Sequence, residues 1–316
     1  IFFSEKSYDK SLYFAKQCNK INTNSIEAHE LIGQILFATG KFNESLKKYK
    51  FIFENCPINQ KEKYIPNIAS NLIEIDRLRE AKTLLSQDGS DIGKYNLSLI
   101  YLKEGNYSQG WRNFDFGINN NSRKVRSINY FSDKLELWHP DKKFNSVLVL
   151  GEQGIGDEIM YSSLISDLID TKIKVGIFMD RRLKGLLSRS LGNHEFIDNQ
   201  EEAIQKGYSS YIPLASLCKF FRNSKDDFEK NNFYFQSDEK ILKKLITNYK
   251  SQKPRIGISW HTESFSHGTQ RNIKLSKLSH LLRNENIDFI NLQYGDCATE
   301  IKRLSKKLKR NIFLDD

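Results

Sequence analysis

An eight-residue segment, GEQGIGDE at 151–158, directly follows the apolar run SVLVL and combines three glycines with three carboxylates. The glycines Gly151, Gly154 and Gly156 permit a tight turn and a close approach of the backbone to a ligand. Free N–H groups at the start of the helix predicted after this turn favour anionic or hydroxyl-rich ligands. The GxxGxG spacing differs from the GxGxxG of dinucleotide folds and from the GxxxxGK of phosphate-loop NTPases, which argues against both classes.

Asp157 falls in the first turn of that predicted helix, at the carboxyl end of the preceding strand. Two roles are open for it. An acidic residue in a first helical turn caps free amides and stabilises the helix macrodipole. The carboxyl edge of an open parallel sheet is also where ligands bind, and where a general base would lie. Glu152 and Glu158 are alternatives, and Glu158 is equally suited to be a solvated helix residue.

The residues before about 120 show helical periodicity and a self-similarity of about 34 residues. Copies lie in AHELIGQILFATGKFNESLKKYKFIFENCP, NIASNLIEIDRLREAKTLL and KYNLSLIYLKEGNYSQGWRNF, and a half-copy begins the chain. The pattern resembles the tetratricopeptide repeat, in which small residues let paired helices approach and aromatic residues fill the space between repeats. We expect a helical array over 1–116 whose concave surface binds peptides or partner domains.

From residue 145 onward, short apolar runs alternate with helical segments, which predicts parallel sheets with crossover helices. After a connection over 117–144, we expect one Rossmann-like domain over 145–236 and a second over 237–316. The second domain ends soon after its third predicted strand, so we expect it to be incomplete. The predicted fold class is therefore α plus α/β, an α-solenoid followed by one complete and one partial Rossmann-like domain.

The composition argues against several classes of protein. No apolar run approaches the roughly 20 residues that cross a bilayer, and the N-terminal residues lack a secretion signal, so we expect a cytoplasmic location, or one at the inner membrane surface. The four cysteines are far apart and form no CxxC pair, so we predict no metal site and reduced thiols.

The net charge of +10 is dispersed along the chain, which argues against a nucleic-acid partner. The one dense basic run, KRLSKKLKR at 302–310, follows a helical period that places Ile301, Leu304 and Leu308 on one face. This pattern favours a solvated helix whose apolar face packs inward.

Six segments, in this order, together resemble the bacterial tetratricopeptide proteins that carry a glycosyltransferase domain: NYSQGWRNFDF, LVLGEQGIGDEIMYSSLI, YIPLASL, IGISWHTES, QRNIKLSKL and FINLQYGD. Those proteins are similar to the ADP-heptose:lipopolysaccharide heptosyltransferases and, more distantly, to the O-linked N-acetylglucosamine transferases. The resemblance implies a GT-B architecture, in which the acceptor binds the first Rossmann-like domain and a nucleotide-diphosphate sugar binds the second. It implies no metal and no cofactor besides this co-substrate.

The resemblance also implies roles for single residues. Asp157 corresponds to the proposed general base, and the turn of Gly151, Glu152, Gln153, Gly154 and Gly156 shapes the acceptor side of the cleft. A cation after the first strand of the second domain would neutralise the donor diphosphate, and Arg271 is the first choice, with Lys274 second. The other residues implied at the donor are Ser259, Trp260, His261, Gln293 and Tyr294.

Two residues near the implied donor site keep open roles. His267 is either a ligand or a loop residue. In the segment LQYGD, either Asp296 caps the next helix, or Gln293 or Tyr294 faces the donor. The family segments that grip the nucleotide base and ribose do not occur before Asp316, so we expect turnover to belong to the intact protein. The function predicted is sugar transfer to a glycan or protein hydroxyl, with the array holding the acceptor or a partner. The alternative is an interaction scaffold with a non-catalytic Rossmann-like domain.

Overall fold

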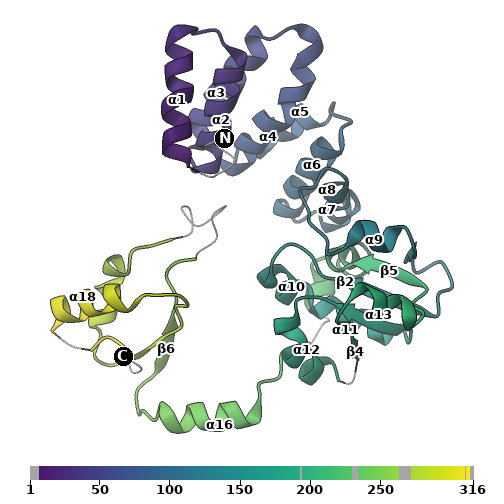
Figure 1. Ribbon diagram of the computed structural model, residues 1–316, viewed down its shortest axis with the longest axis vertical. Coiled ribbons are helices and arrows are strands. Elements are labelled where there is room, and N and C mark those ends of the chain that lie inside the picture. The colour runs from purple at the N-terminus through teal and green to yellow at the C-terminus, as the bar shows by residue number, and fades with distance from the viewer. Residues whose placement is uncertain (1–6, 193, 230–233, 263–271, 310, 314–316) are drawn as a thin grey trace. The chain divides into compact units, whose positions relative to one another are not determined.

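The computed structural model describes residues 7–192, 194–229, 234–262, 272–309 and 311–313. The chain divides into two compact units, Pro57–Asp238 and the combination of Ile1–Cys56 with Glu239–Asp316. The fold is α plus α/β: helices precede a parallel sheet of five strands, and two further parallel strands follow it. Figure 1 shows this order, from purple N-terminal helices to the yellow C-terminal segment.

Three helices form the described chain before Cys56, namely α1 (Tyr8–Ile21), α2 (Ile26–Ala38) and α3 (Phe42–Asn55). The second and third pack closely because Gly33 has no side chain: a Cβ there would lie 2.9 Å from the Tyr49 ring. The Ser45 hydroxyl group donates to the Gly33 carbonyl oxygen across the same contact, at 2.8 Å. Small residues thus bring paired helices together, as the repeat pattern predicts.

Further helices begin the unit Pro57–Asp238. They are η1 (Ile58–Tyr64), α4 (Ile65–Glu74), α5 (Leu78–Leu85), α6 (Asp91–Lys103), α7 (Tyr107–Phe114) and α8 (Phe116–Asn119). The contact of α6 with α7 again depends on a glycine, because a Cβ on Gly110 would collide with the Leu102 side chain. Asn96 in α6 donates its side-chain amide to the Ser70 hydroxyl group of α4 at 3.1 Å, which joins one helix pair to the next.

The five-stranded sheet is wholly parallel, with the order β1-β5-β2-β3-β4. Its strands are β1 (Glu136–Leu137), β2 (Ser146–Leu150), β3 (Lys174–Phe178), β4 (Glu195–Phe196) and β5 (Ser210–Pro213). Every residue of β2 is buried, as expected for a central parallel strand covered on both faces. Since the chain adds β3 and β4 on one side of β2 and β5 on the other, the order reverses between β2 and β5.

Alternate residues of β2 face two different cores. Val147 and Val149 pack with residues of α7 and of the helices Ser163–Asp170 and Cys218–Phe221, whereas Leu148 and Leu150 pack with residues of the helices Ile128–Ser132 and Gln200–Gln205. Burial of each such side chain stabilises the fold by roughly 1.5 to 3 kcal/mol. The helices of this part are α9 (Ile128–Ser132), α10 (Ile155–Tyr161), α11 (Ser163–Asp170), η2 (Arg181–Leu183), α12 (Lys184–Leu191), α13 (Gln200–Gln205), η3 (Leu214–Leu217), α14 (Cys218–Phe221) and α15 (Asp226–Glu229).

The segment 117–144, expected as a connection, contributes α9, the edge strand β1 and a crossing of the sheet's carboxyl edge. Val125 forms an antiparallel bridge with Glu152, directly after β2. On either side of this bridge, the Arg126 N–H donates to the Gly151 carbonyl oxygen at 2.8 Å and the Gln153 N–H donates to the Lys124 carbonyl oxygen at 2.7 Å. The chain therefore lies across the end of the central strand.

The C-terminal part carries α16 (Glu239–Asn248), β6 (Arg255–Ile258), η4 (Leu275–Leu278), η5 (Leu281–Arg283), β7 (Asp288–Asn291) and α18 (Ala298–Leu308). The two strands pair in parallel, and Phe313 adds a parallel bridge to Phe289. Ile301 and Leu304 are buried in the core of this part and Leu308 packs against it, which confirms the predicted apolar face of the basic helix. Among the described residues, no helix combines the length and the apolar character needed to cross a membrane.

Candidate functional site

The turn after β2 is shaped by its glycines in two different ways. Gly151 is closely surrounded, since a Cβ there would collide with the Glu158 carboxylate and lie 3.1 Å from the Met179 Cα atom. Gly156 has open space where a Cβ would lie. Gln153 adopts a left-handed conformation with φ of 59°, which reverses the chain before Gly154, the N-cap of α10. The first glycine thus serves packing, and the last leaves the surface of the turn open.

Glu152 does not face an open cleft. Its two carboxylate oxygens each accept a 2.8 Å hydrogen bond from the Arg123 guanidinium group, and both side chains are only 1% exposed. The Ala215 N–H also donates to Glu152, at 2.6 Å. Burial raises the pKa of the Glu152 carboxyl group, although the positive charge of Arg123 opposes the rise. The structure therefore corrects the expectation that Glu152 lines the acceptor side, because both oxygens of its carboxylate are engaged in this buried ion pair.

Arg123 continues the network toward the helical array. Its guanidinium group donates to the Asp115 carboxylate at 2.8 Å, and the Ser216 hydroxyl group and Lys219 ammonium group also donate to Asp115, at 2.6 and 2.8 Å. Burial alone would raise the pKa of Asp115, but Lys219 and Arg123 together hold it below its usual range. Since Asp115 directly follows α7, this network ties the helices to the sheet.

The position of Arg123 matters for ligand binding. In open α/β sheets, ligands commonly bind outside the carboxyl ends of the strands where the strand order reverses. That point here lies between β2 and β5, and the Arg123 side chain fills it by bonding to Glu152 after β2 and approaching Ser216 after β5. The one weak sequence signal for this role is an arginine within a polar segment whose pattern predicts a connection.

Glu158 is fully buried, which corrects the interpretation that it is a solvated helix residue. Its carboxylate accepts a 2.5 Å hydrogen bond from the Arg126 Nε atom and a 2.8 Å bond from the Asp180 N–H group. Arg126 and Asp180 themselves pair at 3.2 Å. The sequence did not reveal this second network, whose members lie 22 to 54 residues apart along the chain.

Asp157 is the carboxylate of the turn that remains half-buried and enters no ion pair among the described residues. One of its oxygens accepts from the Gly154 N–H group at 3.1 Å, so it caps the start of α10. Tyr95 and Tyr161 lie within its electrostatic range. Burial raises the pKa of both phenols, and the charge of Asp157 adds to the rise, so both stay protonated and able to donate.

A second polar site lies at the carboxyl ends of β6 and β7. Gln293, only 7% exposed, accepts hydrogen bonds at its Oε1 atom from the backbone N–H groups of Trp260 and His261, both at 2.9 Å, and from the Ser259 hydroxyl group at 3.2 Å. Its amide group donates to the carbonyl oxygens of His261 and Tyr294 at 3.0 and 2.8 Å. The structure thus brings five of the predicted donor residues together around one side-chain amide.

Two further contacts fix the shape of this loop region. The Trp260 indole N–H donates to Glu300 in α18 at 2.9 Å, and the other oxygen of Glu300 accepts from the Leu275 N–H group at 2.9 Å. The hydroxyl groups of Thr262 and Tyr294 lie 3.1 Å apart. Glu300 is a positioning residue that the sequence did not single out, because it resembled any other solvated helix residue.

The predicted cations of the donor site are only partly placed. Lys274 is exposed and precedes η4, two residues after Asn272, whose side chain forms two hydrogen bonds with the Thr262 backbone. Arg271 and His267 lie outside the described residues. Their roles therefore stay predictions.

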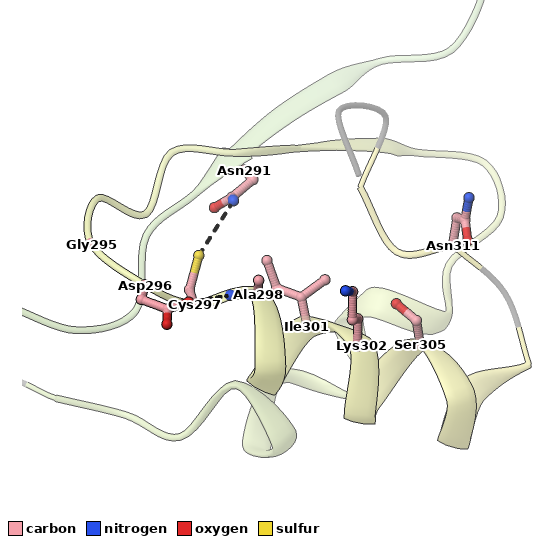
Figure 2. A pocket seen from close by; sticks show the side chains of 9 residues that line it. All are labelled: Asn291, Gly295, Asp296, Cys297, Ala298, Ile301, Lys302, Ser305 and Asn311. Carbon is pink, nitrogen blue, oxygen red and sulfur yellow. Dashed lines mark hydrogen bonds between the residues drawn. The ribbon is translucent and has the colours of Figure 1, made fainter.

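A cavity of about 560 Å³ opens beside this site, between the end of β7 and α18 (Figure 2). Asn291 and Asp296 lie at one end, where the Asn291 amide contacts the Cys297 sulfur at 3.6 Å, and Lys302 and Ser305 line the helix side. The Asp296 carboxylate accepts from the Ala298 N–H group at 3.3 Å, consistent with its predicted capping role. In the part of the chain that the structure describes, no three His, Cys, Asp or Glu residues cluster as metal ligands would.

Comparison of the chain with known proteins gives distant similarities. No protein-family model matches it. Over 238 residues it is 22% identical to protein FlbA of Caulobacter vibrioides, a match that covers 68% of this chain and 39% of that protein. The chain therefore spans well under half the length of this relative. A solved structure of a mutant Thermobaculum terrenum O-GlcNAc transferase is similar with a TM-score of 0.37 and 12% identity, and the match covers 98% of this chain and 70% of that one.

Proposed function

We propose that the chain belongs to a GT-B glycosyltransferase that transfers a sugar from a nucleotide-diphosphate sugar to a hydroxyl group of a glycan or protein, without a metal ion. The observation that carries the proposal is that the three carboxylates after β2 differ in burial and in ion pairing. Glu152 and Glu158 are buried in ion pairs, whereas Asp157 stays half-buried at the carboxyl edge of the sheet and has no ion-pair partner in the described part of the chain. Of the three, only Asp157 can reach an acceptor.

Asp157 acts as general base in this proposal. Its carboxylate takes the proton of the acceptor hydroxyl group while the hydroxyl oxygen forms a bond to the anomeric carbon of the donor sugar. The bond from that carbon to the diphosphate breaks at the same time, and the nucleotide diphosphate leaves with the electron pair. Proton removal by a positioned carboxylate accelerates such reactions by roughly 100- to 10,000-fold. The capping bond to Gly154 occupies one oxygen and fixes the orientation of the other.

The donor binds at the second site in this proposal. Gln293 holds the loop of Ser259, Trp260 and His261 against the end of β7, which makes a rigid polar surface at the carboxyl edge of that sheet. Rigid polar groups stabilise developing charge better than mobile ones, because they need not reorganise during the reaction. Arg271, with Lys274 as second choice, supplies the positive charge for the leaving diphosphate.

The helical array has a separate role. The repeats before residue 116 hold the acceptor or a partner protein. The Asp115 network joins the end of α7, the last full repeat helix, to the sheet. Such arrays commonly bind their ligands on an extended concave surface.

A second candidate function is an interaction scaffold with a non-catalytic sheet domain. One observation favours it: Arg123 fills the point where the strand order reverses, at which ligands bind in many sheets of this kind. In that case the repeats alone would carry the function.

Donor binding separates the two candidates. Calorimetric titration of the intact protein with UDP-, GDP- and ADP-sugars should detect one donor, and Arg271→Ala should weaken it by at least about tenfold, since a charge-assisted bond to phosphate is worth about 1.5 to 3 kcal/mol. Arg283→Ala, on the η5 helix, is the matched control and should leave the affinity unchanged. Failure of all three donors to bind would leave the scaffold as the function.

A further inference from the structure

A cavity of about 640 Å³ lies at the carboxyl ends of β1 and β5, bounded by the segment 118–125 and by α9. Its volume falls within the range of about 300 to 1,000 Å³ that small-ligand sites occupy. Figure 1 shows α9 beside β5 on this part of the sheet. The cavity belongs wholly to the unit Pro57–Asp238 and is separate from the cavity of Figure 2.

Tyr211 of β5 is the residue that makes this cavity unusual. It lines the cavity and is only 8% exposed, yet its hydroxyl group has no hydrogen-bond partner among the described residues. Burial raises the pKa of this phenol and no charged neighbour contributes, which fits a hydroxyl group that has no protein partner. The hydroxyl oxygen is not fully enclosed by protein atoms, so it opens onto the cavity, where water or a ligand can complete its hydrogen bonds.

The polar groups around the cavity are mostly neutral. Asn119, Asn121 and Asn129 are among the lining residues, and a side-chain amide can both donate and accept hydrogen bonds. The Asn119 amide group already donates to the Asp91 carboxylate at 3.0 Å, which leaves its second N–H and its oxygen for a ligand. The charges at its inner wall compensate one another, since Arg123 is paired with Asp115. Lys124 is the remaining charged lining residue, and one exposed cation does not make a phosphate site.

The apolar part of the lining complements these amides. Ile118, Ile128 and Leu137 contribute aliphatic surface, and Leu137 is 47% exposed although it is large and apolar. A sugar ring has the same division, with C–H groups on its faces and hydroxyl groups around its rim. Amide donors and acceptors beside aliphatic surface therefore suit a neutral saccharide better than they suit an anion.

We propose that this cavity binds a neutral, hydroxyl-rich ligand of one or two sugar rings, and that the Tyr211 hydroxyl group and the three asparagine side chains hold it. The inference rests on the proposed function, because the ligand is then a non-reacting part of a glycan acceptor. It places the recognition of the acceptor at β1 and β5 and leaves proton removal to Asp157 after β2. The Arg123 network keeps the floor of the cavity rigid between these strands.

The test needs neither donor nor turnover. The intact protein is applied to an array of neutral, sialylated and phosphorylated saccharides, and the affinity of the best neutral saccharide is measured by calorimetry. We expect retention of neutral saccharides, and a loss of about 3- to 10-fold in affinity in Tyr211→Phe, the worth of one hydrogen bond. Tyr130→Phe is the matched control, since Tyr130 lies in α9 but does not line the cavity.

Stability separates ligand binding from a structural role. Without saccharide, Tyr211→Phe should unfold at the same denaturant concentration as the parent protein or a higher one, because the hydroxyl group it removes has no protein partner. Asn129→Trp, at the exposed rim, should block the cavity and abolish saccharide binding. Retention of no neutral saccharide, preference for the charged saccharides, or unchanged affinity in both variants would overturn the inference. Donor binding and sugar transfer are measured separately, so a failure here is distinct from a failure of the proposed function.

Discussion

Arg123 and Glu152, 29 residues apart in the sequence, form a bidentate ion pair at the carboxyl end of the central strand, with both bonds at 2.8 Å and neither side chain exposed by more than 1%. The pair occupies the place where a sheet of this topology usually admits a ligand. It joins the segment before the sheet to the turn after β2 and, through Asp115, to α7. In our proposals the base is therefore Asp157, and the saccharide site is the cavity beside Tyr211.

Removal of one partner of this pair should destabilise the protein strongly. Arg123→Met leaves the Glu152 carboxylate buried without a counter-charge, which typically costs about 3 to 5 kcal/mol of unfolding free energy. The double variant Arg123→Met/Glu152→Gln removes both charges and keeps an acceptor for the Ala215 N–H group, so it should recover at least about 1 kcal/mol of the loss. Urea unfolding measures both, and a single-variant cost below about 1 kcal/mol would show that the pair does not hold the segment in place.

Two glycines of the same turn should respond in opposite ways to alanine. Gly151→Ala drives a methyl group against the Glu158 carboxylate and the Met179 backbone, and should destabilise the protein by about 1 to 3 kcal/mol. Gly156→Ala meets open space inside α10 and should be neutral or stabilising by up to about 1 kcal/mol, since alanine favours helix. Thermal unfolding of the two variants side by side tests this, and equal effects would contradict the account of the turn.

Gln293 should tolerate no carboxylate. Gln293→Glu keeps the oxygen that accepts three hydrogen bonds but replaces the donating amide with an oxygen facing the carbonyl oxygens of His261 and Tyr294. Two partly buried acceptors then lose their donor, at about 0.5 to 1.5 kcal/mol each, and donor affinity should fall with stability. Gln252→Glu, on the exposed segment before β6, is the control for the added charge. Equal donor affinity in both variants would contradict a role of Gln293 in donor binding.

The edge of the sheet should make stability depend on pH in the acid range. Hydrogen bonds from Lys206 and Tyr208 lower the pKa of Glu195 from 4.5 to about 2. The unfolded chain therefore binds a proton that the folded protein does not bind between these values, and this contribution to stability is lost as the pH falls from about 4.5 to about 2. Glu195→Gln should flatten the pH dependence of unfolding in that window, whereas Glu201→Gln, at the exposed start of α13, should leave it as it is.

Local patterns in the sequence predict the fold well, because the periodicity of apolar residues depends on the geometry of a single helix or strand. The buried run of β2, the paired helices around Gly33 and Tyr49, and the apolar face of α18 all follow from periodicity. The grouping of Ser259, Trp260, His261, Gln293 and Tyr294 also followed, since consecutive parallel strands end at one edge.

The long-range ion pairs did not follow from the sequence. Arg123 contacts Glu152, and Arg126 contacts Glu158, because residues 123–126 cross the end of β2. The polar composition of this segment does not predict that it lies there. For the same reason the residues alone leave Glu152 and Glu158 open as alternatives to Asp157 for the base. Burial distinguished them, and burial depends on the tertiary fold.

The most direct test of the central claim compares sugar transfer by the intact protein with transfer by its Asp157→Asn variant. An asparagine side chain keeps an oxygen for the Gly154 N–H group, so the cap on α10 survives and only the basic oxygen is lost. We predict donor affinity within about twofold of the parent protein and transfer slower by about 100- to 10,000-fold. Transfer by Asp157→Asn at the parental rate would contradict the claim and reduce Asp157 to a helix cap.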